Sequence, residues 1–132
     1  MAHLPWVDFL GTHPTAHLVA AVIVPARSAS HLLRLRRLMQ HLIEDQQPAG
    51  DYATAIVRPT EIAHIHCGFA DKADADRFAM VAKAQRTKPR DEWRSRCCFR
   101  LDAEKEIALA GVLARRKSRR SGRPADCRPP VA

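Results

Sequence analysis

The sequence lacks a long apolar run. A membrane-spanning helix takes about 20 mainly apolar residues, and the 132 residues contain no such stretch. No basic segment precedes an apolar one at the N-terminus, so a secretory signal is not indicated. Four cysteines, Cys67, Cys97, Cys98 and Cys127, include a vicinal pair and do not form the pattern of a secreted disulfide framework. These absences predict reduced thiols, no membrane partner and a cytoplasmic location.

Glycine and aromatic residues are scarce. The five glycines are too scattered to form a phosphate-binding loop or a dinucleotide-binding turn, and no GxSxG elbow occurs. Aromatic residues make up 5% of the chain, which leaves little surface for stacking nucleic-acid bases. We therefore expect a protein that is not an enzyme and that binds no cofactor.

The charge is unevenly distributed along the chain. Residues 1–85 contain eight Lys or Arg and eight Asp or Glu, whereas residues 86–132 contain fourteen against six. The whole formal charge of +8 therefore belongs to the C-terminal third. Such an asymmetry is typical of proteins that bind a polyanion such as nucleic acid, although a solvated basic tail has the same composition.

Hydrophobic periodicity predicts alternating strands and helices. Short β-branched or alternating runs indicate strands, and apolar residues at three-to-four spacing after a capping residue indicate helices. The expected strands are 16–24, 52–58, 61–69 and 93–101, and the expected helices are 28–45, 71–85 and 103–117. The first six elements match the ferredoxin-like split βαβ order (βαββαβ), an α+β fold with two helices on one face of a four-stranded antiparallel sheet. The last helix is an addition to that fold.

The chain is divided into three parts. Residues 1–14 are expected to form an irregular arm over the core, and residues 15–117 a single α+β domain, for which one core is sufficient at this length. Residues 118–132 are rich in Pro, Ser and Arg and have almost no large apolar side chain. We expect this segment to be a disordered basic tail, because it cannot bury enough surface to offset the entropy of ordering.

Strand alternation predicts a basic open face of the sheet. If Ala63, Ile65, Cys67 and Phe69 face the helices, the side chains between them face outward. The residues expected on the open face are His64, His66, Arg94, Arg96, Arg100, Tyr52, Thr54 and Arg58. Guanidinium groups with an aromatic ring are physically similar to the platforms that bind single-stranded nucleic acid. The alternative is that alternating arginines protect an edge strand from aggregation.

A second basic feature lies at the C-terminus. Its cations are Arg115, Arg116, Lys117, Arg119, Arg120 and Arg123. They would make salt-sensitive contacts with phosphates without reading a base sequence. The alternative is a solvated helix end whose cations compensate the helix dipole.

The histidines and cysteines of the chain could in principle form a zinc site or a nucleophilic thiolate. His64 and His66, with His17 and Cys98, have the side chains that zinc prefers, but no paired spacing fixes a ligand set, so no metal is predicted. Cys67 follows His66 directly, and neighbouring residues of a strand point to opposite sides. A histidine-activated thiolate is therefore not expected there.

The sequence thus predicts a small, non-enzymatic accessory protein that contacts nucleic acid, DNA or RNA, through its C-terminal basic segment and additionally through the open sheet face. The alternative is a dimeric structural or ligand-binding module without affinity for nucleic acid. In that alternative, the open face of the sheet forms the homodimer contact, and its apolar residues are Val19, Ala21, Ile23, Ile56 and Ile62.

Overall fold

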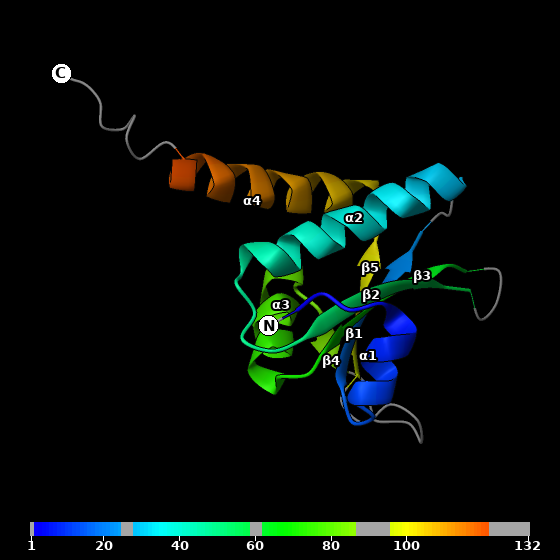
Figure 1. Ribbon diagram of the computed structural model, residues 1–132. Helices are drawn as coiled ribbons and strands as arrows, with labels where there is room; N and C mark the ends of the chain where they lie inside the picture. Colours follow the sequence, from blue (N-terminus) through cyan, green and yellow to red (C-terminus); the bar gives the residue numbers. More distant parts are fainter. Residues whose placement is uncertain (1, 25–27, 59–61, 87–95, 122–132) are drawn as a thin grey trace.

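The computed structural model describes residues 2–24, 28–58, 62–86 and 96–121 (Figure 1). These residues form one sheet and four helices, which confirms the α+β class. The strands are β1 (His17–Ile23), β2 (Tyr52–Val57), β3 (His64–Phe69), β4 (Gln85–Arg86) and β5 (Arg96–Leu101). The helices are α1 (Trp6–Thr12), α2 (Ala29–Asp45), α3 (Lys72–Ala82) and α4 (Ala103–Ser121).

The sheet is mixed, with the strand order β2-β3-β1-β5-β4. β1 is central, as expected from the apolar residues on both of its faces, and it pairs antiparallel with β3 and parallel with β5. The ferredoxin-like arrangement is therefore not confirmed, and the expectation of a purely antiparallel sheet is wrong. The cause is one additional reversal of the chain. The two-residue β4, at the end of the predicted helix 71–85, runs antiparallel to β5.

The hydrophobic core lies between one face of the sheet and the helices α2, α3 and α4. Ile65, Cys67 and Phe69 of β3 face it as predicted and are at most 1% exposed. Phe78 of α3 packs against Phe69 and Phe99, with ring centroids 5.5 and 6.4 Å apart. Burying these side chains supplies the main force that holds the helices on this face.

The helix starts follow from capping residues in the sequence. Ser28 accepts a hydrogen bond from the backbone N–H of His31, and Asp71 accepts one from that of Ala73. Asp102 does the same for the backbone N–H of Lys105 at the start of α4. These side chains satisfy N–H groups that have no partner within the helix. No helix in the described ranges is long and apolar enough to cross a membrane.

Helix α4 differs from the prediction in phase and in length. The sequence pattern predicted a core-facing stripe of Ile107, Ala110, Leu113 and Ala114. Leu113 does face the core, together with Leu109, whereas Ile107, Ala110 and Ala114 are exposed to solvent. The helix continues to Ser121, so residues 118–121 are helical and not part of a disordered tail. The remainder of the predicted tail, 122–132, lies outside the described residues.

The N-terminal segment is more ordered than the predicted irregular arm. Residues 2–4 run beside β2, where the N–H of Leu4 donates to the carbonyl of Tyr52 and the N–H of Tyr52 donates to that of Ala2. The chain then forms α1, which packs on the face of the sheet opposite the core. A Cβ at Gly68 would lie only 2.6 Å from the Phe9 ring, so glycine is what lets α1 approach the sheet.

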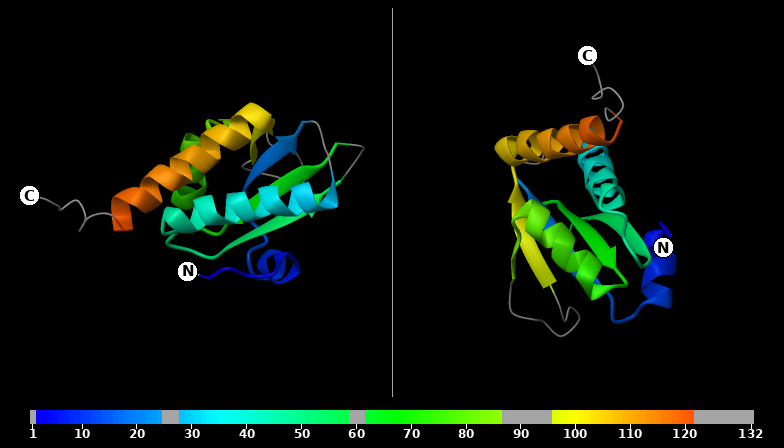
Figure 2. Two further views of the ribbon diagram at one scale, coloured as in Figure 1. Left: turned by 90° about the horizontal axis from the view of Figure 1, so that it is seen from above. Right: turned by 90° about the vertical axis from the view of Figure 1, so that its left-hand side faces the viewer.

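Helices α2 and α4 run side by side in the same direction (Figure 2). Each follows one of the two parallel strands, so both begin at the same end of the sheet. His31 contacts Glu106 near the helix starts, through Nε2 and Oε1 at 3.2 Å. Asp45 contacts Arg116 near the far ends, through Oδ2 and Nη1 at 3.4 Å. The polar contacts at both ends fix the alignment of the two helices.

Candidate nucleic-acid interface

The second face of the sheet is ordered in cross-strand rows. The pairing registers place Val57, His64, Val22 and Arg100 in one row across β2, β3, β1 and β5. The next row is Ala55, His66, Ala20 and Cys98, and the third is Ala53, Gly68, Leu18 and Arg96. His64, His66, Cys98 and Arg100 therefore share one face, as alternation predicted.

Most of this face is not open. Phe9 of α1 is fully buried, and its ring lies against Gly68. Trp6 meets His66 edge-on, with ring centroids 6.2 Å apart, and His66 is only 6% exposed. Helix α1 thus covers Gly68 in the third row and His66 in the second. The side chains of His64, Cys98 and Arg100 stay at least partly accessible.

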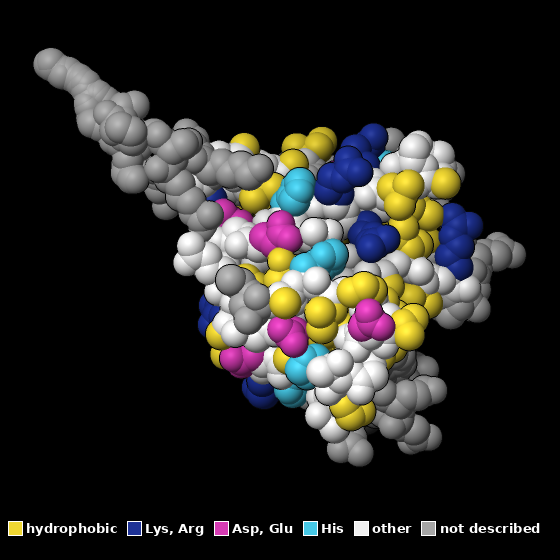
Figure 3. Space-filling view, viewed as in Figure 1, with side chains coloured by type: hydrophobic (Ala, Val, Ile, Leu, Met, Phe, Trp, Pro, Cys, Tyr) yellow, Lys and Arg dark blue, Asp and Glu magenta, His cyan; other side chains and the backbone are white. Residues whose placement is uncertain are grey.

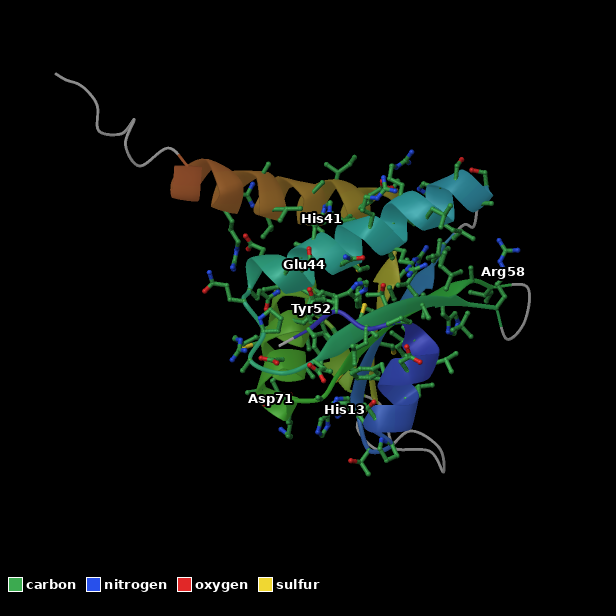
Figure 4. The ribbon with its side chains drawn as sticks, viewed as in Figure 1. His13, His41, Glu44, Tyr52, Arg58 and Asp71 are labelled. Atoms are coloured by element: carbon green, nitrogen blue, oxygen red, sulfur yellow. The ribbon has the colours of Figure 1, made fainter. Side chains whose placement is uncertain are left out.

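Two residues predicted for the open face lie on the other side of the sheet. Tyr52 and Thr54 are 6% and 2% exposed and contact α2. The placement predicted for them is wrong, because Tyr52 pairs with Phe69 and Thr54 pairs with Cys67, both of which face the core. Arg58 is exposed just after β2 (Figure 4). A nucleic-acid surface that combines Tyr52 with the histidines is therefore excluded.

Tyr52 instead belongs to a polar cluster beneath α2. Its hydroxyl donates to Oε2 of Glu44 at 2.8 Å, and Gln40 donates to the same oxygen at 3.0 Å (Figure 4). Burial alone would raise the pKa of Glu44, but these hydrogen bonds and the nearby His41 and His3 hold it below its ordinary value. Burial, followed by the hydrogen bond to Glu44, raises the pKa of Tyr52. The pair therefore joins a neutral phenol to a carboxylate and stabilises the contact between α2 and β2.

The arginines predicted on the last strand have three different outcomes. Arg100 is exposed and lies 3.7 Å from Oδ2 of Asp102 through Nε. Arg96 belongs to β5, but its side chain is outside the described part of the chain, as is all of Arg94.

A hollow of about 890 Å³ lies beside Arg100 of β5. It is lined by Val22, Val24, Lys83, Cys98, Phe99, Arg100, Asp102, Glu104, Lys105 and Ala108.

The C-terminal basic segment begins on α4. Glu104 and Glu106 occupy the first turn, and from Ile107 to Ser121 the helix contains no acidic residue. Arg115 is exposed, and Arg116 is half-buried by its contact with Asp45. Lys117, Arg119 and Arg120 continue the helical backbone, with side chains outside the described part, and Arg123 lies beyond it. Arg115 and Arg116 therefore belong to α4, a different element from the β3 strand that carries His64 and His66.

A further basic surface lies along α2 and the end of β2. The sequence pattern indicated an ordinary solvated face for Arg34 and Arg37 of α2, whereas it placed Arg58, just after β2, on the basic open face of the sheet. Figure 3 shows Lys and Arg side chains over α2 and at the outer end of β2, with apolar side chains between them. Arg34 and Arg37 are exposed, and Arg36 Nε donates to the hydroxyl of Thr54 at 3.1 Å. A signal was present in the sequence, because no acidic residue occurs between Ser28 and Ile43.

The residues weighed for a metal or nucleophilic site do not come together. His17 pairs with Phe69 and so faces the core side, away from His64 and His66. Ala20 lies between His66 and Cys98 in the sheet, which separates their backbones by roughly 10 Å. Within the described ranges, no three His, Cys, Asp or Glu side chains form a group that could hold a metal ion. Cys67 is fully buried, and burial raises the pKa of its thiol.

Comparisons of the chain with protein-family models, curated proteins and solved structures find no match.

Proposed function

We propose that this protein binds nucleic acid without catalysing a reaction, through the arginine-rich C-terminal part of α4 and the basic segment that follows it. The observation that carries the proposal is the charge separation along one continuous helix. Both acids lie in the first turn, and five cations lie between positions 115 and 120. Like charges at this density repel one another, and a bound polyanion relieves this repulsion. The cations of the helix in turn replace counterions that are condensed on the polyanion, and the release of those counterions favours binding.

The helical backbone supports this use of the segment. The end of α2 anchors α4 through Asp45 and Arg116, so the basic turn leaves the domain in a fixed direction. Cations on a preformed helix lose less conformational entropy on binding than cations on a disordered chain. Phosphate contacts of this kind carry no base sequence, so the proposal makes no distinction between DNA and RNA.

The open face of the sheet has a smaller part in the proposal than the sequence suggested. Among the described side chains of this face, those of His64, Cys98 and Arg100 stay at least partly accessible beside α1, and Arg100 already lies near Asp102. We retain Arg100 as an additional phosphate contact. The alternative of a sheet-to-sheet dimer has less support, because Val19, Ala21 and Ile23 face the helices. Ile56 also packs against the core, and Ile62 alone of that predicted set is strongly exposed. A cytoplasmic location is part of the same proposal.

A salt series with the full chain tests the proposal. Labelled 20-nucleotide single-stranded DNA, single-stranded RNA and duplex DNA are titrated by fluorescence anisotropy between 50 and 200 mM salt. On duplex DNA, the logarithm of the association constant falls as the logarithm of the salt concentration rises, and each phosphate contact adds about 0.9 to the steepness of this slope. Removal of residues 117–132, which keeps the Asp45–Arg116 contact, should lower the slope by several of these units.

The matched control replaces Lys72 and Lys83 with Gln, which removes cations from α3 and its C-cap and should leave the slope unchanged. Equal slopes for the full and the truncated chain would reject residues 117–132 as part of the binding element. Absence of binding to all three probes at 50 mM salt would reject the proposed function as a whole.

A further inference from the structure

We propose that the hollow beside β5 is a binding site for a small organic anion with an apolar body, an aliphatic or aromatic carboxylate. The hollow lies where the end of β5, the start of α4 and the C-terminal end of α3 meet. The ammonium groups of Lys83 and Lys105 would bind the carboxylate. The site is separate from the proposed nucleic-acid surface, because Arg115 lies about 15 Å further along the axis of α4 than Lys105.

The hollow has the size and the lining of a small-molecule site. Its volume of about 890 Å³ falls within the range of about 300–1,000 Å³ that is typical of ligand pockets. Val22 and Val24, which are half-buried, and Ala108, which is exposed, contribute apolar surface to its lining. A bound ligand would remove part of this surface from water, so the hollow favours a ligand with an apolar body.

Two lysines from different helices meet at this hollow. Nζ of Lys105 donates to the carbonyl of Ala82 at 2.9 Å and lies 5.8 Å from the centroid of the Phe99 ring. An ammonium group has three N–H donors, so two remain after the bond to Ala82. Lys83 follows Ala82 directly, at the C-cap of α3, and its exposed side chain also lines the hollow. Because Lys105 is already held in place, an anion that binds it costs little further side-chain entropy.

The charges of the lining favour an anion over a cation. The cations are Lys83, Arg100 and Lys105, and the acids are Asp102 and Glu104. Asp102 is occupied, because Oδ1 accepts from the backbone N–H of Lys105 and Oδ2 lies 3.7 Å from Nε of Arg100. Among the described residues, Glu104 forms an ion pair with neither lysine. The two ammonium groups therefore remain available for a carboxylate, whose oxygens accept charge-assisted hydrogen bonds.

The test titrates the full-length protein into anilinonaphthalene sulfonate, a fluorescent dye with one anionic group on an aromatic body. The dye should gain fluorescence on binding, and decanoate should displace it. Decanol should displace it at least about 10-fold less effectively, because the alcohol brings no charge to the lysines. Methyl NMR with saturating decanoate should shift the signals of Val22, Val24 and Ala108. The signal of Val7, an exposed apolar side chain on α1, should stay unchanged.

Paired substitutions provide the matched comparison. Lys83→Gln with Lys105→Gln should weaken decanoate binding at least about 10-fold, whereas Lys72→Gln, which removes an exposed cation from α3, should not. Ala108→Trp should fill the hollow and abolish binding. Ala114→Trp, at another exposed position of α4, should leave binding unchanged.

Three results would overturn the proposal. The first is no binding of the dye or of decanoate, and the second is equal binding of decanoate and decanol. The third is a shift at Val7 as large as that at Val24, which would indicate general adhesion to apolar surface. If the 20-nucleotide probes shifted the same methyl signals as decanoate, the hollow would belong to the nucleic-acid surface, and the carboxylate site would be rejected as well.

Discussion

Asp45 of α2 and Arg116 of α4 form an ion pair across the two parallel helices, with the carboxylate side chain 4% exposed and the guanidinium 41% exposed. A buried carboxylate that loses its cation is costly, whereas the loss of an exposed pair costs little. This contact therefore decides how firmly the basic end of α4 is held to the domain.

Arg116→Ala should lower the free energy of unfolding by about 1–2 kcal/mol, because Asp45 keeps its buried position without this partner. Urea denaturation followed by circular dichroism measures the change. Arg115→Ala, one residue earlier and exposed, is the control and should change stability by less than about 0.5 kcal/mol. Equal losses for the two variants would show that the ion pair does not anchor α4.

Gly68→Ala should displace α1 from the sheet, because the new Cβ would fall 2.6 Å from the Phe9 ring and 3.1 Å from that of Trp6. We expect a loss of about 1–3 kcal/mol in stability and a red shift of tryptophan fluorescence as Trp6 gains water. Gly11→Ala meets nothing within 4 Å. On a helix it should be neutral or stabilising by up to about 1 kcal/mol. Unchanged fluorescence in the Gly68 variant would contradict the packing of α1.

Tyr52→Phe should cost about 1 kcal/mol at neutral pH, because it removes the hydrogen bond to the Glu44 carboxylate. The pKa of Glu44 is lowered in the fold, so its contribution is present above the ordinary carboxyl pKa and is lost as pH falls through the folded value. The pKa of Tyr52 is raised, so its contribution is complete below the ordinary tyrosine pKa, about 10, and is lost as pH rises above it.

The difference in stability between the native protein and Tyr52→Phe should therefore be largest between about pH 5 and pH 9 and shrink on both sides. Urea titrations across this range measure it, with Glu104→Gln as the control for a general loss of negative charge. A difference that stays constant from pH 4 to pH 10.5 would argue against a bond between a neutral phenol and a carboxylate.

Cys67 should resist alkylation in the folded protein, because its thiol is fully buried and burial raises its pKa, which keeps it protonated. Iodoacetamide should modify the partly exposed Cys98 first, with Cys67 slower by more than about 100-fold until urea unfolds the chain. Mass spectrometry of proteolytic peptides distinguishes the two sites. Early modification of Cys67 would show that the sheet opens locally around β3.

Arg115→Gln should weaken nucleic-acid binding by a similar factor on every sequence and reduce the salt slope by about 1, as expected for one phosphate contact. The measurement is the anisotropy salt series on two oligonucleotides of different sequence. If the substitution instead changed the preference between the two sequences, Arg115 would contact base edges and the phosphate assignment would fail.

Local patterns in the sequence predicted much of the fold. The central position of β1, the inward phase of β3 and the caps at Ser28, Asp71 and Asp102 follow from alternation and from hydrogen-bonding side chains within a few residues. The direction of β5 could not be predicted in this way, because it depends on the chain reversal at β4, which only two residues mark. Direction in a sheet is set by connections and not by the strand's own residues.

The errors in side-chain placement have a common origin. β2 reads YATAIV, in which both faces carry small or apolar residues, so alternation did not fix which face Tyr52 takes. The same ambiguity affects α4, where alanines fill several possible stripes and Leu109 was not distinguished from Ile107. The candidate site changed accordingly. Tyr52 lies on the core side of the sheet, and α1 covers His66, so neither belongs to the accessible part of the open face. The arginines of α2, which the sequence pattern assigned to a solvated face, form a further basic surface.

The parallel pairing of β1 with β5 also bears on how the chain folds. Ile23 pairs with Leu101, so one side of the central strand stays without its neighbour until almost the whole domain has left the ribosome. Contacts between residues this distant form late and slow folding. Until then the nascent chain exposes an apolar strand edge to other chains, so synthesis that stops before residue 96 should yield an aggregating product.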